Sequence, residues 1–325
     1  MAPLPPAVQT DGLQRRFGGT DAVEHLDLRV ERGEIYGFLG PNGAGKTTTV
    51  RMLTTLLSPT GGRAAVAGHD VERAPGAVRL RIGAALQEVS LDPKQTGAEL
   101  LRLQGRLYGL SRRTVAGRVD QLAALIDLGD ALHRRVGTYS GGMRRRLDLA
   151  AALVHDPEVL FLDEPTTGLD PISRARVWAE VRRLKEQLGT TVFLTTQYLE
   201  EADALAGRVG IIDRGRLVAE GTPAELKHSV GSDLIVARVA GEAARVAPAL
   251  RSIPGVRSVE ERGDEVVVAT DDGPAALTPV AVALAGSDVP VRELTLRTPT
   301  LDDVFLELTG AHLDDDDPEA EEDAA

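Results

Sequence analysis

The chain contains no cysteine, so it can form neither a disulfide bond nor a thiolate metal site. A chain without disulfide bonds is expected in a reducing compartment. Long hydrophobic runs are missing as well, because the longest uncharged stretch, residues 273–287, contains Pro274 and Pro279 and is too short to span a bilayer. The N-terminus has neither the basic start nor the apolar centre of a signal peptide. The sequence therefore predicts a subunit that forms no membrane pore by itself.

Basic charge is also scarce, since 37 lysines and arginines stand against 49 acidic residues and give a net charge of −12. Nonspecific nucleic-acid binding depends on a basic surface, so no nucleic-acid partner is expected. Eight acidic residues fall between positions 314 and 323, and residues 312–325 are predicted to form a disordered, solvated tail. The run Arg144-Arg145-Arg146 is predicted to face a partner or solvent, with nucleic-acid contact as the less favoured alternative.

The chain does contain a glycine-rich loop between an apolar strand, predicted over residues 34–39, and a helix predicted over residues 49–57. The loop matches the phosphate-binding pattern G-x-x-x-x-G-K-[ST] with residues Gly40, Pro41, Asn42, Gly43, Ala44, Gly45, Lys46, Thr47 and Thr48. Its glycines let backbone N–H groups turn inward around phosphate oxygens. Lys46 would then contact the β- and γ-phosphates, Thr47 would bind Mg²⁺, and Thr48 would add a phosphate contact.

A second strand carries acidic residues at its end. The continuous apolar run over residues 159–162 is typical of a central parallel strand, and Asp163 and Glu164 follow at its carboxyl end. Ligands bind at that edge of a parallel sheet. Asp163 would hold Mg²⁺ through water, and Glu164 would polarise the attacking water as a general base.

A Ser-Gly-Gly turn, Tyr139-Ser140-Gly141-Gly142-Met143, stands before this strand. At this distance from a strand that ends in Asp-Glu, it resembles the signature motif of ABC-type ATPases. The resemblance implies an α/β P-loop NTPase fold with a mixed-sheet core and a helical subdomain at about 88–150, and ATP and Mg²⁺ as cofactors. It also implies that two copies sandwich two ATP molecules. The phosphate loop of one copy and the signature of the other, from Tyr139 to Gly142, would bind each ATP.

Three further positions follow the ABC pattern. Gln87, after a short strand predicted over residues 82–86, matches the glutamine that senses Mg²⁺ and the transmembrane partner. Asp170 matches the loop that crosses the dimer interface. Phe17 stands where the family places an aromatic ring against adenine, although a lone phenylalanine is normally a core residue.

One position departs from the commonest pattern. After the strand predicted over residues 191–194, many ABC ATPases carry a histidine that contacts the γ-phosphate, whereas this chain has Gln197. An amide can donate a hydrogen bond, but it cannot carry a proton or a positive charge as histidine can. Gln197 is therefore expected to assist catalysis by Lys46 and Glu164, with hydrolysis depending mainly on Glu164.

The pattern of elements predicts two domains. After a flexible N-terminus of residues 1–7, residues 8–228 are expected to form the ATP-binding domain, with helices over 98–110 and 114–128, the second capped by Ser111, and a closing hairpin over 209–219. Strands over 234–239, 256–259 and 265–268 alternate with helices near 242–250 and 275–285. They predict a small α+β accessory domain over residues 229–311, which closes with an amphipathic helix over 301–310.

Three segments, residues 139–148, 195–203 and 301–310, together look like the ATP-binding subunit of daunorubicin-resistance-type ABC exporters. This resemblance implies a motor subunit on the cytoplasmic face of the cell membrane. It would couple ATP-driven dimerisation to efflux of a drug or another lipophilic compound through a separate multi-span permease.

Other functions of ABC ATPases remain as alternatives. Those that act on ribosomes usually hold two cassettes in one chain, whereas this chain has one phosphate loop. Relatives that act in chromosome maintenance insert a long coiled coil, for which the stretch from Lys46 to Ser140 is too short. A resistance ATPase that binds or senses the drug without transporting it is less firmly excluded by the sequence.

Overall fold

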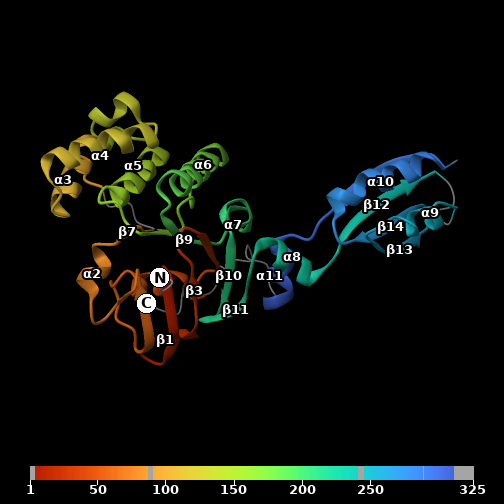
Figure 1. The fold of residues 1–325 in the computed structure, drawn as a ribbon, viewed down its shortest axis with the longest axis horizontal. Coiled ribbons are helices and arrows are strands. Elements are labelled where there is room, and N and C mark those ends of the chain that lie inside the picture. Colours follow the sequence, from red (N-terminus) through yellow and green to blue (C-terminus); the bar gives the residue numbers. More distant parts are fainter. Residues whose placement is uncertain (1–3, 87–90, 241–244, 288, 311–325) are drawn as a thin grey trace, which may run out of the picture. The chain divides into compact units, whose positions relative to one another are not determined.

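The structure, a computed structural model, describes residues 4–86, 91–240, 245–287 and 289–310. Over these residues the chain divides into two compact units, one ending at Pro223 and one from Ala224 to Gly310 (Figure 1). The sequence placed the change of domain after residue 228, whereas helix α8 (Pro223–Val230) falls almost entirely within the second unit. In the described part of the chain no helix combines the length and the apolar character needed to cross a bilayer.

A six-stranded sheet forms the centre of the first unit. Its strands are β4 (Ile35–Leu39), β7 (Ile82–Ala85), β8 (Val159–Asp163), β9 (Thr191–Thr196), β10 (Arg208–Asp213) and β11 (Arg216–Gly221). They lie in the order β11-β10-β4-β9-β8-β7, and all neighbours are parallel except β11, which runs antiparallel to β10. Strands β4, β8 and β9 are buried along their whole length, which explains the apolar runs at 35–39, 159–162 and 192–194.

A second sheet of the first unit is antiparallel. It contains β1 (Val8–Phe17), β2 (Thr20–Leu26), β3 (Arg29–Val30), β5 (Gly61–Val66) and β6 (His69–Asp70). Its inward side chains form one hydrophobic core with helix α1 (Lys46–Leu53) and with one face of the central sheet. Ala7, which the sequence assigned to the flexible N-terminus, is buried, and its N–H donates to the carbonyl oxygen of Val30 at 2.8 Å.

Helices cover the rest of the first unit. They are α2 (Pro75–Arg79), α3 (Gly97–Leu107), α4 (Arg112–Leu125), α5 (Gly141–Leu153), α6 (Pro171–Leu188) and α7 (Leu199–Leu205). Buried leucines and valines of α3, α4 and α5 pack together in one core, the expected helical subdomain (Figure 1). The predicted cap of α4 is confirmed, because the Ser111 hydroxyl accepts a hydrogen bond from the N–H of Thr114.

The second unit is a four-stranded antiparallel sheet covered by helices. Its strands are β12 (Asp233–Val239), β13 (Val256–Arg262), β14 (Glu265–Thr270) and β15 (Val291–Arg297), in the order β13-β14-β12-β15. Its further helices are α9 (Ala247–Arg251), α10 (Gly273–Ala285) and α11 (Leu301–Thr309). Strand β15 was not predicted from the sequence, because the adjacent Arg292 and Glu293 interrupt its alternation and the whole edge strand stays exposed or half-buried.

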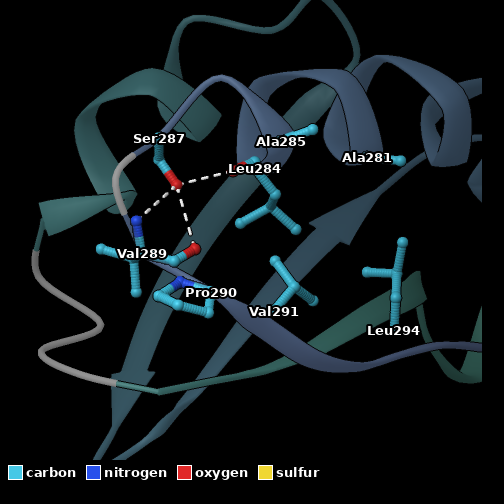
Figure 2. A pocket seen from close by; sticks show the side chains of 8 residues that line it. All are labelled: Ala281, Leu284, Ala285, Ser287, Val289, Pro290, Val291 and Leu294. Atoms are coloured by element: carbon cyan, nitrogen blue, oxygen red, sulfur yellow. Dashed lines mark hydrogen bonds between the residues drawn. The ribbon is translucent and has the colours of Figure 1, made fainter.

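An apolar groove of about 450 Å³ lies between the end of α10 and the start of β15. Figure 2 shows its lining, in which alanine, leucine, valine and proline side chains face the groove. The one hydroxyl group among the lining side chains, that of Ser287, donates to the carbonyl oxygen of Leu284 at 2.6 Å. The groove therefore presents an almost purely apolar surface.

Candidate active site

The phosphate loop joins the end of β4 to the start of α1. Gly43 and Gly45 have φ values of 77° and 104°, in the left-handed region that favours glycine. A Cβ atom at Gly45 would lie 2.4 Å from the carbonyl oxygen of Ala22, whereas one at Gly43 would meet nothing within 4 Å. The loop is therefore wedged against β2 on one side and open on the other. Its backbone N–H groups can donate hydrogen bonds to a phosphate group, which the positive end of α1 also attracts.

Lys46, the first residue of α1, is 4% exposed. Its ammonium group donates to the carbonyl oxygens of Gly40 at 2.6 Å and Pro41 at 3.0 Å, and it lies 3.6 Å from a carboxylate oxygen of Glu164. Burial lowers the pKa of Lys46, and the nearby Glu164 carboxylate opposes that shift. The structure thus places two of the predicted catalytic groups, Lys46 and Glu164, next to each other.

Asp163 is almost fully buried at the carboxyl end of β8. Its carboxylate accepts a 2.5 Å hydrogen bond from the Thr195 hydroxyl and a 3.4 Å one from the Thr47 hydroxyl. Thr195 was not singled out from the sequence. Its position at the end of β9, beside β8, was the only available signal.

These oxygen groups fit a magnesium ion. Mg²⁺ prefers oxygen ligands and is usually bound by one or two protein groups together with water and substrate phosphates. Thr47 and Asp163 supply a hydroxyl and a carboxylate on one side of the phosphate loop. In the described residues no cluster of three or more histidine, aspartate or glutamate side chains could hold a metal without such further ligands.

Glu164 has an unusual backbone conformation, with a φ of 47°. Left-handed backbone is costly for a residue with a side chain and persists only where its surroundings hold it. The Glu164 N–H lies 3.1 Å from both the hydroxyl and the carbonyl oxygen of Thr195, and its carboxylate accepts a hydrogen bond from the Thr167 hydroxyl at 3.3 Å. This conformation turns a carboxylate toward Lys46.

The signature turn begins helix α5. Ser140 is exposed and caps the helix, since its hydroxyl accepts a hydrogen bond from the Met143 N–H at 3.3 Å. Gly141, Arg144 and Arg145 line a cavity of about 310 Å³ that Glu164 also lines. Tyr139 is buried instead, and its hydroxyl donates to the carbonyl oxygen of Ala131 at 2.5 Å. Its ring thus packs inside the helical subdomain, while Ser140 and Gly141 are exposed.

The remaining predicted residues lie around this centre. Phe17 is 47% exposed, and the Arg15 guanidinium lies 4.4 Å from the centre of its ring. Asp170 caps α6, and the hydroxyl of Ser173, at 2.6 Å from its carboxylate, lowers the pKa of Asp170. Gln197 is half-buried between β9 and α7. Gln87 lies outside the described residues.

The expectation that the Arg144–Arg146 run faces solvent or a partner is wrong for Arg145, which is 7% exposed. It shares the inner face of α5 with Leu149, one helical turn away. Its guanidinium donates to main-chain carbonyl groups at the ends of β7 and β8. Arg146 is half-buried and donates to the carbonyl oxygens of Ile126 and Asp127, so only Arg144 is exposed.

Comparison with known proteins places these features in a family. Residues 23–167 match the family model described as ABC transporter, and residues 221–309 match the model described as ATP-binding protein DrrA1-3-like, C-terminal domain. The chain is 52% identical over 306 residues to the daunorubicin resistance ATP-binding protein DrrA3 of Streptomyces coeruleorubidus, covering 94% of this chain and 96% of that protein. The chain belongs to the daunorubicin-resistance-type ATP-binding proteins of the ABC transporter family.

Two other ATP-binding proteins are also similar to this ABC ATPase. It is 49% identical to the daunorubicin/doxorubicin resistance ATP-binding protein DrrA of Streptomyces peucetius, over 95% of this chain and 94% of the relative. It is 37% identical to the Nod factor export ATP-binding protein I of Ralstonia nicotianae, over 95% and 96%. The family resemblance and the α/β P-loop fold predicted from the sequence are thereby confirmed.

A solved structure shows the same fold. The cbiO1 subunit from Clostridium perfringens, described as part of the ABC transporter complex cbiONQ, matches 68% of this chain and 90% of its own. The TM-score is 0.64 at 24% sequence identity.

Proposed function

We propose that this ABC ATPase drives the efflux of a drug or another lipophilic compound through a separate multi-span permease at the cytoplasmic face of the membrane. The observation that carries the proposal is the convergence of Lys46, Asp163 and Glu164 beside a phosphate loop, in a chain half-identical to drug-resistance ATP-binding proteins. The relatives include a Nod factor export protein as well as drug-resistance proteins, so the cargo is proposed as a class and not as one compound.

In the proposed reaction the loop N–H groups and Lys46 bind the phosphates of ATP. Thr47 and Asp163 would hold Mg²⁺, which would neutralise charge on the phosphates. Glu164 accepts a proton from the water that attacks the γ-phosphorus, so that a bond to water oxygen forms while the bond to the ADP oxygen breaks. The contact between the Glu164 carboxylate and the Lys46 ammonium group, 3.6 Å apart, supports this role because it places the carboxylate beside the phosphate loop.

The second half of each ATP site is proposed to come from another copy of the chain. Ser140 and Gly141 lie exposed at the start of α5, where backbone N–H groups can bind phosphate oxygens. Each chain has one phosphate loop and one signature, so two copies would form two complete sites. The γ-phosphate would then close the dimer by binding the closed state better than the open state.

The transport proposal is tested by efflux from cells. Co-expression of the chain with a candidate multi-span permease should lower the accumulation of a fluorescent lipophilic drug, and the Glu164→Gln variant should abolish that effect. Copurification from membranes should recover the permease with the chain. Drug resistance that persists without a permease, and with Glu164→Gln, would instead indicate a protein that binds or senses the drug without transporting it.

A further inference from the structure

Arg145 is a buried arginine whose guanidinium contacts the chain at two strand ends of the first unit and Asp148 of its own helix. Its side chain reaches from the signature helix α5 to the ends of two parallel strands. Its Nε donates to the carbonyl oxygen of Pro165 at 3.0 Å, and Nη2 donates to that of Asp163 at 3.2 Å. Nη1 donates to the carbonyl oxygen of Leu86 at 2.6 Å, and a weaker 3.5 Å contact reaches Ala85.

Two of these carbonyl groups belong to the residues on either side of Glu164. Asp163 precedes Glu164 and Pro165 follows it, and both carbonyl groups accept hydrogen bonds from the same guanidinium. Glu164 itself holds the left-handed φ of 47°. A left-handed backbone conformation persists only where neighbouring groups hold it. The hydrogen bonds from Arg145 hold the two peptide groups next to this conformation.

The chemistry of arginine suits this position. The guanidinium is planar, has five N–H donors in a fixed fork and remains charged, whereas lysine offers a compact ammonium group. Burial lowers the pKa of Arg145, and the carboxylates of Asp148 and Asp163 oppose that shift. A buried charge is costly unless its hydrogen bonds are made, and these bonds go to the carbonyl groups of Asp163 and Pro165 beside Glu164 and to that of Leu86 after β7.

We propose that Arg145 is a positioning residue that holds the backbone on both sides of Glu164 and links it to the signature helix of the same chain. The inference rests on the proposed role of Glu164 as general base. Ser140 caps the helix that carries Arg145. When Ser140 binds the ATP of a second copy, a shift of α5 would move Arg145 and, through it, the peptides around Glu164. Binding at one site would thereby adjust water activation at the other.

The first test compares Arg145→Gln with Arg146→Gln. Arg146 lies on the same helix and also donates to two main-chain carbonyl oxygens, but those of Ile126 and Asp127, away from Glu164. In steady-state ATP hydrolysis by the full-length chain, Arg145→Gln should lower kcat about tenfold or more, while KM for ATP changes less than about twofold. Arg146→Gln should keep kcat within about threefold, and Arg145→Lys should fall between Arg145→Gln and wild type.

The second test measures the loop directly by amide hydrogen exchange of the full-length chain. Exchange in the peptide covering residues 163–167 should be faster in Arg145→Gln and unchanged in Arg146→Gln. If Arg145→Gln does not fold, the same comparison is made with Arg145→Lys. Unchanged exchange at 163–167, or an equal loss of kcat in the variants at both positions, would overturn the inference.

Glu164→Gln separates this inference from the proposed function. If Glu164→Gln hydrolyses ATP normally, the role of Glu164 fails and the inference fails with it. If Glu164→Gln is inactive while a folded Arg145→Gln keeps kcat within about twofold of wild type, the role of Glu164 stands and only the inference about Arg145 is overturned.

Discussion

At the scale of single residues, the site depends on contacts that a few side chains make with the backbone. Lys46 donates to two carbonyl oxygens of its own loop and lies beside Glu164. Asp163 is held by the hydroxyl groups of Thr195 and Thr47. Neutral oxygen groups as well as opposite charges therefore orient the buried side chains of Lys46 and Asp163.

Lys46→Ala should abolish ATP hydrolysis. The variant loses the cation placed for the β- and γ-phosphates, and it leaves Glu164 without its nearest positive charge. The measurement is phosphate release by the purified chain, with a folded state checked by circular dichroism. Activity equal to wild type would contradict the assignment of the phosphate loop.

Gln197→Ala should lower turnover while ATP affinity changes much less. The amide can orient water or donate to a phosphate oxygen, but most of the binding energy comes from the loop. The backbone around Gln197 is held in a turn, because the Tyr198 N–H donates to the Thr196 hydroxyl at 2.9 Å. Phosphate release and nucleotide titration measure the two effects, and unchanged turnover would remove Gln197 from the mechanism.

At the scale of elements, the contact between α5 and α6 contains a buried carboxyl group. Burial raises the pKa of Glu180 to about 7, although Arg146 lies 3.9 Å away and favours the ionised form. Because the pKa is higher in the folded protein, this group contributes stability below the unfolded value of about 4.5 and loses that contribution as the pH rises through about 7.

Glu180→Gln should therefore be more stable than wild type at pH 8 by about 1–3 kcal/mol, and similar to wild type at pH 4.5. Urea unfolding at the two pH values measures the difference. Asp148, whose pKa burial raises to about 6, is present in both proteins and cancels in the comparison. A difference that does not depend on pH would show that Glu180 ionises freely in the fold.

Elements differed in how far the sequence predicted them. The parallel strands β4, β8 and β9 were predicted from their apolar runs at 35–39, 159–162 and 192–194, which burial on both faces of a sheet favours. The antiparallel sheet containing β1 was not predicted. Its longest strand pairs with β2 and β5 through register shifts, so its side chains do not alternate regularly along the sequence.

At the scale of the whole molecule, the proposed dimer gives a test of its own. Glu164→Gln should trap an ATP-stabilised dimer, because the amide keeps the size of the side chain but cannot accept the proton from water. Light scattering with ATP and Mg²⁺, with and without the permease, measures the change in mass. A variant that stays monomeric under both conditions would contradict the sandwich of two copies.

The sequence by itself determined the chemistry of the phosphate loop, because a loop that wraps phosphate uses consecutive residues whose spacing can be read directly. It also determined the family, through the signature and the closing segment. Only the tertiary structure decided the environment of Glu164. Thr195 and Arg145 reach it from other elements, and no local pattern distinguishes Arg145 from the two arginines beside it. Which of the three is buried depends on the face that α5 turns toward the sheet.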